Sequence, residues 1–224
     1  MTDSEESHAP QACVICKSRK TKRNSISSAL YFVSQSIPPE SASIEASLYG
    51  QVLQLIHQTG QLVYDIGARY FQGPHRYLPV CSRSNFYSNV VTLGAIPSAG
   101  FSVLLLTACL TVSAHADQQS LRRATNSLVT FVQESYPISL PLIQARLLLA
   151  VYDYTHGRPE DAFQAIAGCA RMAYAARIHL HCLPAYQKDD ATPTANTKAH
   201  SDMDRLLQAT EAANTWWGII ICER

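Results

Sequence analysis

Residues 140–180 carry the pattern that most limits how this chain can fold. From Leu140 to Tyr152 apolar residues recur at helical spacing and leave almost no polar face, which predicts a buried helix. The run 156–159 (HGRP) then interrupts the helix, because Gly tolerates the left-handed backbone past a helix end and Pro favours the first turn of the next helix. Small and apolar residues return at steps of three and four in the segment that follows: Ala162, Ile166, Cys169, Ala173 and Ala176. The pattern predicts two antiparallel helices joined by a short loop.

The rest of the chain also shows helical rather than strand periodicity. No stretch sustains the alternation of a β-strand, so the predicted class is all-α, a multi-helix bundle of antiparallel helix hairpins behind a disordered N-terminal tail. One helix is predicted from Ser43 to about Phe71, where Gly73 and Pro74 end it. Shorter helices are expected from Ser82 or Ser84 to Val91, over the apolar residues 99–114, and after Asp117.

Two faces can be assigned within these helices. In the helix after Asp117, Arg122 and Arg123 are expected to point away from the apolar stripe of Leu121, Leu128, Val129 and Val132. The last helix is expected to begin at Asp202 as its cap. Its predicted apolar face consists of Leu206, Thr210, Ala213, Trp217, Ile220 and Ile221.

Charge is concentrated near the N-terminus. The chain of 224 residues has 16% charged residues, 47% hydrophobic residues and a formal net charge of +1. Five positive charges lie within residues 17–23, and +1 minus 5 leaves −4 for the remainder. Attraction to nucleic acid is therefore expected only at this segment, since the rest of the chain is mildly repelled by phosphate.

Cysteine usage and hydropathy favour an intracellular protein. The chain has seven cysteines, and five of them are scattered singly, which is typical of a reducing compartment rather than of a disulfide framework: Cys81, Cys109, Cys169, Cys182 and Cys222. The first 30 residues lack the apolar core of a secretory signal. Between Arg83 and Asp117 there is no charged residue, but the strongly apolar part, 103–112, is shorter than a bilayer span of about 20 residues, so no membrane association is expected.

Four motifs resemble the middle homology region of fungal binuclear zinc cluster transcription factors. They are RYFQGPHRYLPVCSRSNF at 69–86, FSVLLLTACLTV at 101–112, the pair QARLLLAVYDYTHGRPEDAF and AIAGCARMAYAARIHLH within 144–181, and TWWGIIICER at 215–224. They occur in the family's order and cover most of residues 43–224. The resemblance implies a helical regulatory domain that continues past this last motif, so the chain is expected to be cut off within its domain.

The N-terminal segment ACVICKSRKTKR at 12–23 resembles the first half of the family's zinc cluster. In that module six cysteines hold two zinc ions, and the third ligand follows the second cysteine by seven positions. Cys13 and Cys16 match the first two ligands, but Arg23 occupies the third position and the next cysteine is Cys81. Since zinc is usually held by four ligands, an incomplete zinc site is expected.

The resemblance also assigns DNA contacts within this segment. Lys20 matches the lysine that reads base edges in the major groove, and Lys17, Arg19 and Lys22 match residues that contact phosphates. Without zinc to hold the helix, weak, salt-sensitive and non-specific DNA binding is expected. The alternatives are a basic disordered tail or a nuclear localisation signal.

Other candidate sites have simpler structural explanations. His179, His181 and Cys182 are close enough in sequence to share a metal, but no fourth ligand lies nearby, and His179 or His181 matches a helix-end residue of the family. Trp216 and Trp217 are better explained as core anchors of the last helix than as a binding platform. Glu211 matches an acidic residue that the family places before the paired aromatics, while residues 212–214 (AAN) stand where the family has arginines.

These observations give three segments and a main hypothesis. Residues 1–24 are the remnant of a zinc cluster module, 25–42 a linker, and 43–224 the N-terminal part of a regulatory domain. Common enzyme motifs are absent from the sequence, so no enzymatic activity is expected. The resemblance implies a nuclear transcription regulator with DNA and zinc as family partners, and with a homodimer or a regulatory protein as a further partner. The alternative is a helical protein–protein interaction scaffold that does not bind DNA; a small-molecule sensor or enzyme has the least support.

Overall fold

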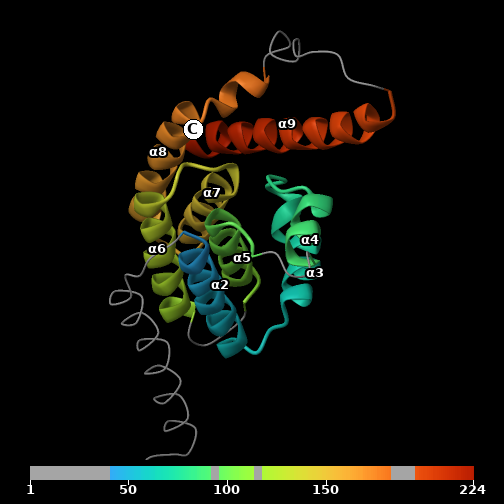
Figure 1. The fold of residues 1–224 in the computed structure, drawn as a ribbon. Helices are drawn as coiled ribbons and strands as arrows, with labels where there is room; N and C mark the ends of the chain where they lie inside the picture. The colour runs from blue at the N-terminus through green and yellow to red at the C-terminus, as the bar shows by residue number, and fades with distance from the viewer. Residues whose placement is uncertain (1–40, 92–95, 114–117, 183–194) are drawn as a thin grey trace, which may run out of the picture.

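All regular secondary structure in the described part of the chain is helical. The computed structural model describes residues 41–91, 96–113, 118–182 and 195–224, and no strand occurs among them. The elements are α2 (Ser41–Gln58), α3 (Val63–Gln72), η1 (Pro74–Arg76), α4 (Arg83–Val91), α5 (Ala99–Val112), α6 (Gln118–Ser135), α7 (Leu140–Thr155), α8 (Pro159–Ala175), η2 (Ile178–Cys182) and α9 (Ala195–Glu223). The all-α prediction is confirmed (Figure 1).

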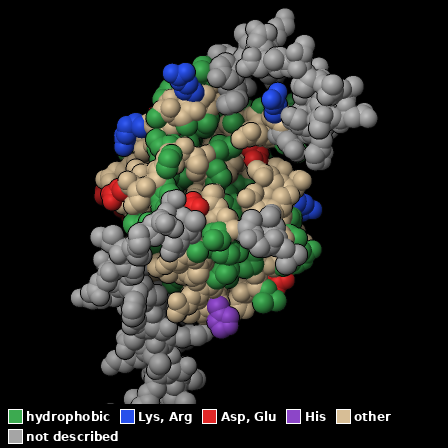
Figure 2. Space-filling model, viewed as in Figure 1, with side chains coloured by type: hydrophobic (Ala, Val, Ile, Leu, Met, Phe, Trp, Pro, Cys, Tyr) green, Lys and Arg blue, Asp and Glu red, His purple; other side chains and the backbone are tan. Residues whose placement is uncertain are grey.

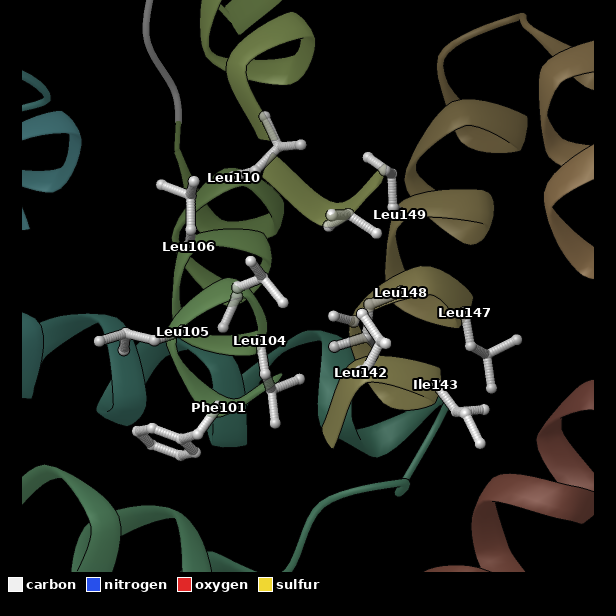
Figure 3. Packing of buried hydrophobic residues seen from close by; sticks show 14 of the residues in the cluster. Phe101, Leu104, Leu105, Leu106, Leu110, Leu142, Ile143, Leu147, Leu148 and Leu149 are labelled. Atoms are coloured by element: carbon white, nitrogen blue, oxygen red, sulfur yellow. The ribbon is translucent and has the colours of Figure 1, made fainter. Parts of the chain in front are cut away.

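Helix α5 is the centre of the core. Every residue from Ala99 to Leu110 is buried, and α5 packs on α7, α2, α6 and α3. Ser98 caps the helix as its side chain accepts a hydrogen bond from the Phe101 N–H at 3.3 Å. Figure 3 shows Leu104 of α5 together with Leu142 and Leu148 of α7 in the space between these two helices. Residues 103–110 of this apolar run are thus buried in a protein core, as the sequence predicted, and residues 111 and 112 are partly buried.

Helices α7 and α8 form the predicted hairpin. His156 ends α7, Gly157 has φ 75°, and Pro159 is the first residue of α8. Gly adopts a left-handed backbone conformation at this position most readily, because it has no Cβ to clash. Ala162, Ile166, Cys169 and Ala173 are buried on the inner face of α8. The two helices and the loop of the predicted hairpin are confirmed, but α8 ends at Ala175, and Ala176 is its C-cap residue rather than part of the helix.

The single helix predicted from Ser43 to Phe71 is wrong. The chain forms α2 and α3, separated by a turn in which Gly60 has φ 73°. Thr59 is buried in this turn, and its Oγ1 donates to the Ile56 carbonyl at 2.6 Å. Apolar spacing continues through the turn, because Leu62 and Val63 fall at helical positions, although Leu62 itself is 69% exposed.

The predicted start and face of the last helix are also wrong. Helix α9 begins at Ala195, so Asp202 lies inside it rather than at its cap. Its buried face carries mainly small and polar residues: Glu211, Ala212, Thr215, Gly218 and Ile219. Leu206, Trp217 and Ile221 are exposed. Gly218 explains the close approach, since a Cβ there would lie 2.9 Å from Cδ1 of Leu78 and 3.1 Å from Cδ2 of Leu147.

Candidate functional site

The residues predicted to bind zinc and DNA lie outside the described part of the chain. Cys13, Cys16, Lys17, Arg19, Lys20 and Lys22 all belong to residues 1–40. Their assignments therefore stay predictions. The side chains of His181 and Cys182 are not described either, whereas the His179 ring lies 5.0 Å from that of Tyr174 and 5.7 Å from that of Trp216, between centroids.

The described structure gathers polar side chains around the segment from Pro79 to Ser82, which precedes α4. Two helices hold its backbone. From α7, Nε2 of Gln144 donates to the Val80 carbonyl at 2.6 Å. From α9, Nδ2 of Asn214 donates to the Pro79 carbonyl at 3.1 Å, and Oγ1 of Thr215 lies 3.5 Å from the Val80 carbonyl. We use the name α9 clamp for Gln144 of α7 together with Glu211, Asn214 and Thr215 of α9.

Glu211 is the charged member of the α9 clamp. It is 5% exposed, and its carboxylate accepts hydrogen bonds from the backbone N–H of Ser82 and from Nδ2 of Asn85, the latter at 2.8 Å. Burial raises the pKa of Glu211, while these two hydrogen bonds oppose the rise. The carboxylate lies at the N-terminus of α4, where the helix dipole favours negative charge.

A thiol lies beside the α9 clamp. Cys81 is buried, and Oη of Tyr70 donates to its Sγ at 3.6 Å. Burial raises the pKa of Cys81 to about 12, and the nearby charge of Glu211 adds to the rise. A thiol that stays protonated is a poor nucleophile and a poor metal ligand, so Cys81 serves as a packed core residue.

A cavity of about 210 Å³ opens between the α9 clamp and the first turn of α4. Its lining includes His75, Arg83, Thr210 and Glu211. Nδ1 of His75 is buried and has no hydrogen-bond partner, and burial followed by the charge of Arg83 lowers the pKa of this imidazole. The lining of the cavity thus brings a carboxyl group, an imidazole and an arginine side chain together.

The structure corrects the interpretation of the paired tryptophans. Trp216 is half-buried and packs edge-on against Tyr174, with ring centroids 5.2 Å apart. Trp217 is 56% exposed and is not a core anchor. The two residues point in different directions on α9, because neighbours on a helix are about 100° apart.

An ion network centred on the buried Asp153 joins α6, α7 and α8, and sequence analysis did not predict it. Arg122 donates two hydrogen bonds to Asp153, at 2.9 and 2.8 Å, and a third to Asp161 at 2.7 Å. Nε of Arg158 also donates to Asp153, at 2.9 Å. The prediction that Arg122 points away from the helix bundle is wrong, while Arg123 is exposed as expected. The side chain of Asp153 is only 4% exposed, and the network gives hydrogen-bond donors to both of its carboxylate oxygens.

Neither a metal cluster nor a membrane-spanning helix occurs in the described part of the chain. Within the described side chains, no group of three or more His, Cys, Asp or Glu is arranged to hold a metal ion. None of the described helices combines the length and the apolar character needed to cross a membrane.

Comparison with known proteins identifies the family. No curated protein and no solved structure matches the chain. The profile of the fungal specific transcription factor domain matches residues 68–219, which include everything from α4 to α8, the α9 clamp and the second half of α3. This family consists of transcription factor domains and not of enzymes. Because the match spans more than half of the sequence, the chain belongs to the fungal specific transcription factor domain family.

Proposed function

We propose that this chain is a nuclear transcription regulator in which residues 43–224 form the regulatory domain and residues 1–24 form an incomplete zinc-dependent DNA-binding module. The family match over residues 68–219 is the observation that carries the proposal. The helical body would modulate transcription, and the basic segment around Lys20 would give weak, non-specific attraction to DNA.

The donor set does not fit a binuclear zinc cluster. Cys13 and Cys16 supply two thiolates, Arg23 stands at the third ligand position, and Cys81 is the next cysteine. Cys81 is buried, hydrogen-bonded to Tyr70, and has a pKa raised to about 12. Recruiting it to a metal would require unfolding the core around α3. Neither Arg23 nor Cys81 therefore completes a closed site of four ligands around Cys13 and Cys16.

The charge of the body supports DNA contact at the N-terminus alone. Outside residues 17–23 the formal net charge is −4. Figure 2 shows Lys and Arg side chains widely separated on the face of the molecule that it displays, rather than gathered in a basic patch. A surface of this kind gives phosphates little attraction.

Electrophoretic mobility shift assays with the whole chain test the proposal. We expect a weak shift at about 50 mM salt that is lost at about 200 mM and does not change with zinc. Changing Lys17, Arg19, Lys20 and Lys22 to Ala should abolish it, whereas changing the exposed Arg123 and Arg171 to Ala should leave it intact. Tight, zinc-dependent binding to a CGG-type site would contradict the incomplete module.

The alternative function is a helical scaffold that binds other proteins and not DNA. A complete lack of DNA binding at low salt would favour it. A fluorescent fusion expressed in a fungal cell tests the nuclear location, and the variant with four basic residues replaced shows whether the basic segment acts as the localisation signal.

A further inference from the structure

The outer side of α9 carries a stripe of side chains that are mostly apolar and exposed to solvent. Leu206, Trp217 and Ile221 are 56%, 56% and 69% exposed, and Thr210 is exposed between them. Steps of four and seven residues place these four side chains on one side of the helix, opposite its buried face. We call them the α9 stripe. A contiguous apolar surface in water is unfavourable and is typical of an interaction site.

The C-terminal end of the α9 stripe opens into an apolar groove. The groove has a volume of about 580 Å³ and is formed where the end of α9 lies beside α8 (Figure 1). Ile221 lines it together with Tyr154 of α7 and Phe163 of α8, which are 69% and 71% exposed. The stripe and the groove therefore form one apolar surface, of the kind that receives the apolar side of another helix.

The α9 stripe is symmetric about its own midpoint. Leu206 and Ile221 are equally far in sequence from the point between residues 213 and 214. Thr210 and Trp217 are also equally far from that point. A two-fold axis through it would place a second copy of α9 antiparallel on the first, with each Leu206 over the partner's Ile221. Both copies would then contribute the same residues to the contact, as a two-fold interface requires.

Charges near the two ends of α9 match the same arrangement. Arg205 and Glu223 are both exposed, and neither takes part in an ion pair within the described residues. They are 18 positions apart, which is five full turns, so they lie on the same side of the helix. Their midpoint is Asn214, within one residue of the midpoint of the α9 stripe. An antiparallel second copy would bring each Arg205 level with the partner's Glu223, whereas a parallel one would bring like charges together.

We propose that two copies of this chain pair through the α9 stripe, with their α9 helices antiparallel and each Leu206 at the mouth of the partner's groove. The symmetric stripe and the opposite charges at its two ends make this surface complementary to itself, which favours a second copy as the occupant. The stripe covers only about 22 Å of helix, so we expect a reversible dimer with a micromolar dissociation constant. Pairing requires neither zinc nor DNA, so its test is independent of the function proposed above.

Analytical ultracentrifugation of the whole chain between about 1 and 100 μM tests the proposal. We expect a reversible equilibrium between monomer and dimer. A monomer at every concentration would overturn the proposal and leave the surface to a different protein. Assembly beyond two copies would also overturn it, because a two-fold contact closes after the second copy.

Substitutions in the α9 stripe test where the two copies meet. Leu206→Asp and Ile221→Asp each place a carboxylate in the apolar contact, and each should raise the dissociation constant at least about thirtyfold. Leu62→Asp is the matched control and should leave it unchanged. Leu62 is 69% exposed and belongs to the turn between α2 and α3, at the opposite end of the molecule from α9 (Figure 1). Equal weakening by Leu62→Asp and Leu206→Asp would overturn the assignment of the interface.

Exchange of the end charges tests the antiparallel orientation. At about 50 mM salt, Arg205→Glu and Glu223→Arg should each weaken the dimer about fivefold, because two repulsive pairs replace two attractive ones. The double variant restores opposite charges, and its dissociation constant should return to within about twofold of the original. In a parallel dimer each of these residues would meet its own copy, and neither single variant would weaken the contact. Unchanged affinity of the single variants, or no recovery in the double variant, would overturn the antiparallel pairing.

Discussion

The carboxylate of Glu211 in α9 accepts a hydrogen bond from the backbone N–H of Ser82, 129 positions earlier in the sequence. Ser82 directly precedes α4, and its Oγ accepts from the Asn85 N–H at 3.4 Å. Glu211 thus satisfies a backbone donor at a helix start that has no partner within the helix itself. The α9 clamp fixes where α9 sits along the molecule, because a shift of one residue would break this contact.

Replacing Glu211 tests how much the α9 clamp stabilises the fold. Glu211→Ala should lower the free energy of unfolding by about 1–3 kcal/mol, because the Ser82 N–H and the Asn85 amide lose their acceptor. Urea denaturation measures the change. Glu134→Ala, at an exposed position of α6, is the matched control and should stay within about 0.5 kcal/mol of the original chain. An equal effect of the two substitutions would show that the contact contributes nothing.

The raised pKa of Glu211 predicts a pH dependence of stability. Burial is the main cause of the rise above the ordinary value of 4.5. A carboxyl whose pKa is higher in the folded state binds its proton more tightly there, so folding is favoured as the pH falls from neutral towards 4.5. Glu211→Gln removes this titration.

The stability of the original chain relative to Glu211→Gln should therefore increase between pH 7 and pH 4.5. Denaturation of both proteins at a series of pH values measures the difference between their free energies of unfolding. The contributions of the other titrating groups are the same in both proteins and cancel in this difference. A difference that decreases on acidification would mean that the pKa is lowered in the folded state.

The ion network gives a prediction with its own control. Asp153 has a side chain that is 4% exposed and receives Arg122 and Arg158, whereas Asp161 is 52% exposed and receives Arg122 alone. Asp153→Ala should destabilise the chain by about 3–5 kcal/mol, because it leaves two guanidinium groups without their buried acceptor. Asp161→Ala should cost less than about 1 kcal/mol. Thermal or urea unfolding measures both changes in stability. An equal loss of stability in Asp161→Ala and Asp153→Ala would contradict this ranking.

Sequence reasoning predicted the elements that depend on local signals. The apolar helix over residues 99–114 and the turn at Gly157 both follow from short-range chemistry, and both are present. The turn between α2 and α3 was missed although Gly60 marks it, because the apolar spacing on both sides happens to stay in phase.

Long-range relationships could not be predicted in the same way. The face of α9 was assigned from its largest apolar residues, yet close packing requires small ones such as Gly218 and Thr215. Likewise, nothing near Glu211 indicates that its partners are Ser82 and Asn85, since the pairing exists only after α4 and α9 have docked. The predicted zinc and DNA residues lie outside the described part of the chain and are untouched by these outcomes.

Glycine substitutions provide the last test, of how closely α5 approaches α7. Gly100 lies in the first turn of α5, and a Cβ there would collide with Oγ of Ser139 and lie 3.3 Å from the backbone nitrogen of Leu142. Gly100→Ala should therefore destabilise the chain by about 1–3 kcal/mol, since the backbone of α7 would have to move. A Cβ added at Gly50 in α2 would meet no atom within 4 Å, and Gly50→Ala should stabilise the helix by about 0.5–1 kcal/mol. A lower urea midpoint for Gly100→Ala and a higher one for Gly50→Ala would show that the loss of stability comes from the α5–α7 contact. Shifts of both midpoints in the same direction would contradict this explanation.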